Sequence, residues 1–203
     1  MKKFRFLLVA LLGVIMALSL AACGGNDGGD QTNKPNDALT GESNVLVTYF
    51  SWSASNNTKT MAEYIQEYTG GEIFRIQPKT PYTSNYNDVL DVAQQEKNSK
   101  ARPELFENIT QEQIDGYDVI FVGYPVWWYD APMIIYSFLE ANDYSGKKVV
   151  TFATSGGSGI SDSGLKNAID ADFTSGLCIS GFSAGNSART RVENWVTELG
   201  YHK

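Results

Sequence analysis

Apolar runs of strand length alternate with amphipathic helical patterns from residue 44 to the end of the chain. Helical patterns repeat their apolar residues every three or four positions, whereas a buried parallel strand is a short, continuous apolar run. This alternation is typical of βαβ units, in which helices join parallel strands. The chain is therefore predicted to contain an α/β domain.

Five strands and five helices are expected from these patterns. The strands are expected at about 44–50, 72–76, 117–123, 147–153 and 177–182. The helices are expected at about 58–69, 87–100, 131–139, 162–170 and 190–199. The polar alternation in 72–76 indicates a partly exposed strand, and 101–116 shows no regular pattern. Asp130 is the expected N-cap of the third helix, with Pro132 in its first turn.

Five strands joined by right-handed crossovers form a doubly wound parallel sheet. In such a sheet the ligand binds beyond the carboxyl ends of the strands, where the strand order reverses. Three loops of unusual composition follow the first, third and fourth strands, at 51–58, 124–129 and 154–159. We therefore expect all three loops to meet at one edge of the sheet and to form a ligand site.

The first loop is rich in hydroxyl and amide side chains and precedes a predicted helix. The N-terminus of a helix favours a phosphate group. A triphosphate site of the Walker type needs a lysine, which this loop lacks, so one dianionic phosphate is the expected ligand. The alternative is an ordinary polar turn, and Lys59 is expected to point to solvent. The candidate phosphate ligands are Ser51, Ser53, Ser55, Asn56, Asn57 and Thr58.

The second loop contains two adjacent tryptophans between tyrosines. Large apolar rings in a loop need a cover, and a planar ligand is one candidate. Alternatively, one tryptophan covers the sheet and the other is a surface anchor. The candidate ring contacts are Pro125, Val126, Trp127, Trp128 and Tyr129.

The third loop is rich in glycine and hydroxyl groups, so its backbone can approach a ligand closely. The candidates here are Thr154, Ser155, Gly156 and Gly157. A serine hydrolase is excluded, because Ser158 misses the Gly-x-Ser-x-Gly spacing and the single histidine is His202. The histidine and cysteine counts also argue against a metal site. We expect no catalytic side chain.

The N-terminal segments differ from the rest of the chain. Residues 1–22 begin with basic residues, continue as an apolar run and end in Leu-Ala-Ala before Cys23, which resembles a lipoprotein signal peptide. Lipidated Cys23 and a polar, Gly-rich linker to residue 43 would tether a domain at 44–203. The expected location is outside the cytoplasm, on the outer face of the cytoplasmic membrane or on another envelope membrane. An ordinary signal peptide or an uncleaved anchor is the alternative.

Charge and cysteine content narrow the possible partners. The net charge is −7, and removing Lys2, Lys3 and Arg5 with the signal makes it −10. This charge argues against nucleic acid and suits either a basic redox partner or simple solvation. Because Cys23 would carry lipid, no disulfide is expected, and Cys178 is expected to be a buried small hydrophobe.

The three loops together resemble those of the flavodoxin-like family, in particular short bacterial flavodoxin-type lipoproteins, over about 44–201. The matching segments are Tyr49-Phe50-Ser51-Trp52-Ser53 with Asn57-Thr58, Gly123-Tyr124-Pro125-Val126-Trp127-Trp128 with Asp130-Ala131-Pro132, Thr154-Ser155-Gly156-Gly157, and Tyr86-Asn87-Asp88 with Ala93. The resemblance implies strand order 2-1-3-4-5 with helices on both faces. It also implies FMN bound without a metal, its phosphate on 51–58 and its ring between the other two loops.

One departure concerns the phosphate loop. The family pattern is Ser/Thr-x-Ser/Thr-Gly-Asn-Thr, whereas this loop is two residues longer and lacks the glycine. The roles of Ala54, Ser55 and Asn56 therefore stay open, and a weaker affinity for FMN is one expected consequence.

The expected function is that of an FMN-binding electron carrier tethered to a membrane outside the cytoplasm. Its partner would be a redox protein or a small-molecule electron acceptor. One alternative is an FMN reductase that uses NAD(P)H or a quinone, which would make the protein an FMN-dependent oxidoreductase. Another is a lipoprotein binding module that has lost its flavin.

Overall fold

A computed structural model describes residues 43–203. They form one parallel five-stranded sheet of order β2-β1-β3-β4-β5, which confirms the predicted doubly wound topology. The strands are β1 Val45–Tyr49, β2 Glu72–Arg75, β3 Val119–Pro125, β4 Lys148–Ser155 and β5 Asp172–Ser180. The helices are α1 Asn57–Thr69, α2 Tyr86–Ser99, α3 Gln111–Asp115, α4 Met133–Glu140, α5 Ser163–Ala168 and α6 Asn186–Glu198.

The predicted signal peptide, Cys23 and nearly all of the predicted tether lie outside the described residues. Within residues 43–203, none of the helices has the length and apolar character needed to span a bilayer.

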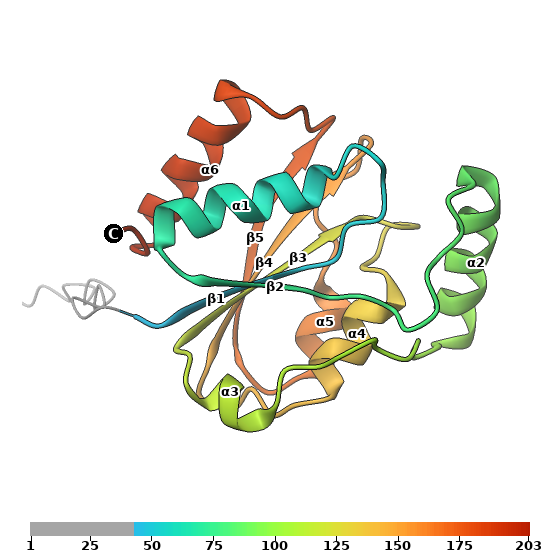
Figure 1. Ribbon diagram of the computed structural model, residues 1–203, viewed down its shortest axis with the longest axis horizontal. Helices are drawn as coiled ribbons and strands as arrows, with labels where there is room; N and C mark the ends of the chain where they lie inside the picture. The colour runs from blue at the N-terminus through green and yellow to red at the C-terminus, as the bar shows by residue number, and fades with distance from the viewer. Residues whose placement is uncertain (1–42) are drawn as a thin grey trace, which may run out of the picture. The chain divides into compact units, whose positions relative to one another are not determined.

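Helices cover both faces of the sheet. Figure 1 shows α1 and α6 on one face, α4 and α5 on the other, and α2 beyond the edge at which the strands end. The side chains of β1, β3 and β4 alternate between two buried clusters, one beneath α1 and α6 and one beneath α4 and α5. The central strands are apolar on both faces because both faces are covered. The edge strand β2 is largely exposed, as its alternating sequence predicts.

Two elements begin earlier than expected. β5 begins at Asp172. The sequence did not predict its first half, because this part is a half-buried edge strand with polar residues and therefore has no continuous apolar run. It contains a register irregularity opposite Val150–Phe152, and Gly176 fits there because a Cβ would lie 1.8 Å from the Thr151 carbonyl oxygen. α6 begins at Asn186, and its first turn is mainly polar.

Two further expectations are corrected near the helix termini. The segment predicted to be irregular contains α3, whose start is stabilised by a capping box of Thr110 and Gln113. The N-cap of α4 is Pro132 and not Asp130. The Asp130 carboxylate instead accepts hydrogen bonds from the Ala131 N–H and the Tyr136 hydroxyl, at 2.8 and 3.0 Å.

Candidate functional site

A cavity of about 780 Å³ opens at the carboxyl edge of the sheet. The three predicted loops line it together with α2, so the structure brings these distant segments to one site. The predicted residues that line it are Ser53, Asn57, Pro125, Val126, Trp127, Trp128, Tyr129, Thr154, Ser155, Gly156 and Gly157. The predicted residues that do not line it are Ser51, Ser55, Asn56 and Thr58. Ser51 instead lines a smaller cavity of about 160 Å³, together with Phe50, Trp52 and Tyr82.

The first loop enters α1 through a left-handed residue. Asn56 is the N-cap with φ 51°, a conformation that asparagine tolerates better than most residues, so the missing glycine is replaced here by asparagine. The backbone N–H groups of Asn57, Thr58 and Lys59 find no acceptor among residues 43–203. Free N–H groups and the helix dipole make this turn suitable for an anion. Lys59 pairs with Glu63 on the helix surface, as expected of a solvent-facing lysine.

The hydroxyl groups of the first loop have three different environments. The Ser51 Oγ is buried and has no hydrogen-bond partner in the described part of the chain. The Thr58 Oγ1 is buried and lies 2.9 Å from the Thr154 Oγ1, so it joins the first loop to the third. Ser53 and Ser55 are more exposed, with their hydroxyl oxygens 2.9 Å apart. The loop thus holds an orphaned buried hydroxyl and free N–H groups, which are the kinds of donor that a phosphate accepts from.

The second loop is a two-residue hairpin turn. Trp127 and Asp130 exchange backbone hydrogen bonds of 2.9 Å, and the residues between them, Trp128 and Tyr129, have φ of 50° and 60°. Positive φ at both central positions is the geometry of a type I′ turn, which normally needs glycine or asparagine. The conformation costs on the order of 1–3 kcal/mol at each bulky residue. Both of these strained residues line the cavity.

The two tryptophans have different roles in the fold. The Trp127 ring packs edge-on against the rings of Tyr82, Phe50 and Trp52, with centroid distances of 5.2, 5.5 and 6.2 Å. The Trp128 side chain is 38% exposed, and its Nε1 donates to the Leu90 carbonyl oxygen of α2 at 2.9 Å. Trp127 therefore belongs to the core of the cavity wall, whereas Trp128 joins the turn to α2.

The third loop lines the cavity with small residues, from Thr154 to Ser158. The Val126 N–H donates to the Thr154 carbonyl at 2.9 Å, which holds the second and third loops together. The Ser155 hydroxyl donates to the Ser158 carbonyl, which closes the loop on itself. A Cβ added at Gly156 or Gly157 would meet no atom within 4 Å, so the backbone here borders open space.

Sequence reasoning missed the contribution of α2 to the site. Its inner face supplies Tyr86, Val89, Leu90 and Ala93 to the cavity. These residues repeat every three or four positions on an otherwise polar helix, and this pattern could have predicted that one face of α2 lines the site. The other lining residues that were not predicted are Trp52, Ser158, Gly181 and Phe182.

The site is electrically neutral in a negatively charged protein. None of the cavity-lining side chains in residues 43–203 is charged. Behind the wall, the Tyr82 hydroxyl donates to Glu96 at 2.8 Å, and burial of both groups raises the pKa of each. No metal-binding cluster is present in this part of the chain. The cavity can hold an uncharged planar ring, and the adjoining turn can hold an anion.

Cys178 lies behind the third loop. It is half-buried, and its thiol is 3.6 Å from the Ser158 carbonyl oxygen. Burial raises the pKa of this thiol, which disfavours its reactive thiolate form. It packs against the core cluster beneath α4 and α5, much as a small hydrophobe does.

Comparison with known proteins agrees with this geometry. A flavodoxin family model matches residues 44–199. A protein from Bacteroides eggerthii that was assigned as a flavoprotein is 35% identical, with a TM-score of 0.66 over 77% of this chain and 98% of its own. One from Bacteroides uniformis, assigned likewise, is 33% identical, with a TM-score of 0.65 over 76% and 98%.

A third structure is a Lactobacillus acidophilus flavoprotein in complex with FMN. It is 22% identical, with a TM-score of 0.54 over 75% of this chain and 98% of its own, and it shares the fold. The comparison with curated proteins gives no match. All three related structures consist almost entirely of the matching domain, because the match covers 98% of each of those chains. The family model covers almost the whole domain, and the chain therefore belongs to the flavodoxin family.

Proposed function

We propose that the chain binds FMN at the carboxyl edge of the sheet and acts as an electron carrier. The observation that carries this proposal is the set of free N–H groups that begin α1, at the end of the loop that also holds the buried, unpartnered Ser51 hydroxyl. A phosphate there would leave a flavin ring next to the neutral aromatic cavity. The FMN complex of the Lactobacillus acidophilus flavoprotein supports the same choice of ligand.

The residues of the site suit FMN better than other nucleotides. No lysine or arginine lines the cavity within the described residues, so a di- or triphosphate would lack compensating charge. Trp127 is fixed by three aromatic neighbours and would orient the ring without losing further conformational freedom. Apolar walls exclude water from one side of the ring. When bound, FMN itself supplies the electron-transfer chemistry.

The location is a further part of the proposal. Lipidation of Cys23 and the Gly-rich linker that follows would hold the domain near a membrane outside the cytoplasm. Replacing Cys23 with serine in the full chain should abolish the incorporation of radiolabelled palmitate into the protein. Equal labelling of the wild type and the Cys23→Ser protein, or no labelling of the wild type, would count against the lipid anchor.

Titration of residues 24–203 with FMN tests the proposed function. We expect one FMN per chain, a flavin absorption band and quenched flavin fluorescence. A colourless domain that does not take up added FMN would contradict the redox function and would favour a binding module without flavin. Rapid anaerobic bleaching by NADH or NADPH would identify a reductase, whereas a carrier should be bleached by these donors slowly or not at all.

A further inference from the structure

The strained turn of the second loop is held by α2. The Lys97 ammonium donates to the Trp128 carbonyl oxygen at 2.6 Å and lies 3.7 Å from a carboxylate oxygen of Asp130. The indole Nε1 of Trp128 donates to the Leu90 carbonyl oxygen at 2.9 Å. α2 therefore contacts both the backbone and the ring of Trp128, and Lys97 joins the first central residue of the turn to the last residue of the turn.

The residues of the turn do not favour its geometry by themselves. Trp128 and Tyr129 both have positive φ, which bulky residues rarely adopt. If the peptide between them rotated to the opposite orientation, the type I′ turn would become type II′, in which only the first central residue has positive φ. This rotation would relieve Tyr129, so a contact outside the turn is needed to explain the observed geometry.

The hydrogen bond from Lys97 opposes this rotation. A trans peptide points its carbonyl and its N–H in opposite directions, so a Trp128 carbonyl held toward Lys97 leaves the Tyr129 N–H on the other side of the turn. That N–H finds no acceptor among residues 43–203, and both residues of this peptide line the cavity. Rotation would break the bond to Lys97 and would replace the free donor with a carbonyl oxygen.

Lys97 also balances a negative charge beside the cavity. The lining side chains in residues 43–203 are uncharged, and Lys97 is not among them. The Lys97 and Asp130 side chains are only 36% and 22% exposed, so solvent screens their charges only in part. Without Lys97, the charge of Asp130 would be unbalanced, and a bound molecule that gains negative charge would be disfavoured.

We propose that Lys97 is a positioning residue for the flavin. It holds the Trp128–Tyr129 peptide in the orientation that leaves the Tyr129 N–H free for the ligand, and it balances Asp130 beside the site. This inference rests on the proposed FMN site. It identifies a residue outside the cavity that sets both the affinity for FMN and the ease with which bound FMN is reduced.

Hydrogen exchange of two amides tests the positioning without FMN. The N–H groups of Trp127 and Asp130 each donate to the carbonyl of the other residue across the turn, so their exchange reports the opening of the turn. Lys97→Met keeps an aliphatic side chain and removes the ammonium. In residues 24–203 without FMN, both amides should exchange at least about tenfold faster in Lys97→Met than in the wild type.

Redox titration of the FMN-loaded protein tests the effect on the flavin. Lys97→Met should bind oxidised FMN about tenfold more weakly, because the N–H donor is no longer held in place. It should also lower the midpoint potential by about 30 mV, which corresponds to a further tenfold loss of affinity for two-electron-reduced FMN. A loss of packing alone would weaken the binding of both forms equally and would leave the potential unchanged.

Two further variants show whether the contact itself is responsible. Lys97→Arg keeps the charge and a donor for the Trp128 carbonyl, so it should restore the amide exchange and the potential of the wild type. Lys100→Met removes the same charge from the same end of α2, but the Lys100 side chain has no hydrogen bond or ion pair within residues 43–203. It should leave the amide exchange unchanged and lower the potential much less than Lys97→Met does.

Three results would overturn the role of Lys97. They are unchanged amide exchange in Lys97→Met, equal effects of Lys97→Met and Lys100→Met, and weaker FMN binding with an unchanged potential. The last result would show that Lys97 serves only the packing of α2. FMN binding by the wild type is measured first, and its absence would contradict the proposed function, whereas the amide exchange would still decide whether Lys97 holds the turn.

Discussion

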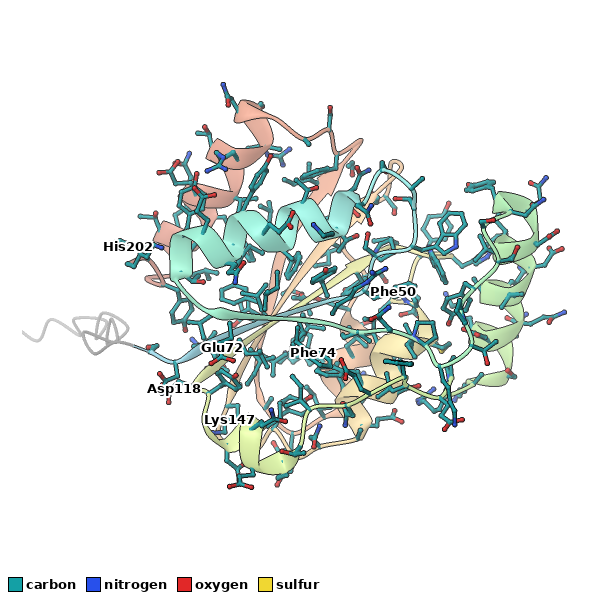
Figure 2. The ribbon with its side chains drawn as sticks, viewed as in Figure 1. Phe50, Glu72, Phe74, Asp118, Lys147 and His202 are labelled. Atoms are coloured by element: carbon teal, nitrogen blue, oxygen red, sulfur yellow. The ribbon has the colours of Figure 1, made fainter. Side chains whose placement is uncertain are left out.

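The amino and carboxyl edges of the sheet differ in how their polar groups are satisfied. At the amino edge, Asp118 accepts from the Asn44 N–H at 2.9 Å, and Lys147 donates to the Asp115 carbonyl at 2.8 Å. The Tyr117 hydroxyl donates to Glu72 at 2.9 Å, and burial together with this carboxylate raises the pKa of Tyr117 to about 12. Figure 2 shows Glu72, Asp118 and Lys147 together, apart from Phe50 at the other edge.

At the carboxyl edge, one buried polar group lacks a hydrogen-bond partner and two bulky residues have unfavourable backbone conformations. The Ser51 hydroxyl is buried without a partner, and Trp128 and Tyr129 have positive φ. Neither feature stabilises the fold by itself, and both lie in the loops of the proposed ligand site. The contacts named at the amino edge are thus made within the fold, although the Tyr144 hydroxyl in the turn before β4 is also buried without a partner in residues 43–203. At the carboxyl edge, the proposed phosphate would supply the partner that the Ser51 hydroxyl lacks.

The largest effect is expected from Trp127→Ala. This ring contacts three aromatic neighbours, so its loss should lower the free energy of unfolding by about 3 kcal/mol. FMN affinity should fall by roughly thirtyfold, as expected from the loss of one stacking contact. Denaturant unfolding and flavin titration measure the two effects. Trp128→Ala is the comparison, and an equal or larger loss of stability there would contradict the assignment of Trp127 as the core of the wall.

Thr58→Val should have the next largest effect. It leaves the buried Thr154 hydroxyl without its partner, which costs about 1–3 kcal/mol. FMN affinity should also fall, because the first and third loops lose their link. Tyr117→Phe provides the control at the amino edge, where loss of one exposed hydrogen bond should cost about 1 kcal/mol or less and leave FMN affinity unchanged. Weaker FMN binding by Tyr117→Phe would contradict the claim that only the carboxyl edge of the sheet takes part in binding FMN.

Ser51→Ala separates stability from binding. Removing a buried hydroxyl that has no partner should leave the free energy of unfolding without FMN unchanged or raise it by up to about 1 kcal/mol. FMN binding should weaken by about tenfold, because the phosphate loses a donor. A substitution that lowers both quantities would show that the hydroxyl serves the fold and not the ligand.

The smallest effect concerns two carboxylates. Burial raises the pKa of Glu96 behind the cavity wall, whereas the guanidinium of Arg102 lowers the pKa of Glu140. Because the pKa of Glu96 is raised in the folded state, its ionisation lowers the stability of the protein as the pH rises above the ordinary carboxyl value of 4.5. Because the pKa of Glu140 is lowered, its protonation lowers the stability as the pH falls below 4.5. At pH 7, Glu96→Gln should therefore stabilise the protein and Glu140→Gln destabilise it, each by less than about 1 kcal/mol.

The pH dependence of these two variants provides the check. Both differences from the wild type should shrink on acidification, when the carboxyl groups are protonated. Unfolding curves at several pH values measure this change. Differences of the same sign for the two variants at pH 7 would contradict the assignment.

The central strands and the position of the site could be predicted because apolar runs and polar loops are local signals. β5 and α3 were not fully predicted, since an edge strand with polar residues and a five-residue helix have weak patterns. Contacts between distant parts of the chain in the site could not be predicted from the sequence. The Thr58–Thr154 pair joins residues 96 positions apart, and the turn at Trp128–Tyr129 lacks the Asn-Gly signal that normally marks it.

The central claim is that the turn beginning α1 holds a phosphate and the cavity holds a flavin ring. Parallel titrations of residues 24–203 with FMN and riboflavin test it most directly, because the two ligands differ only in the phosphate. We expect FMN to bind at least about 100-fold more tightly, which corresponds to about 2.7 kcal/mol. Equal affinities for FMN and riboflavin, or no binding of either, would contradict the claim.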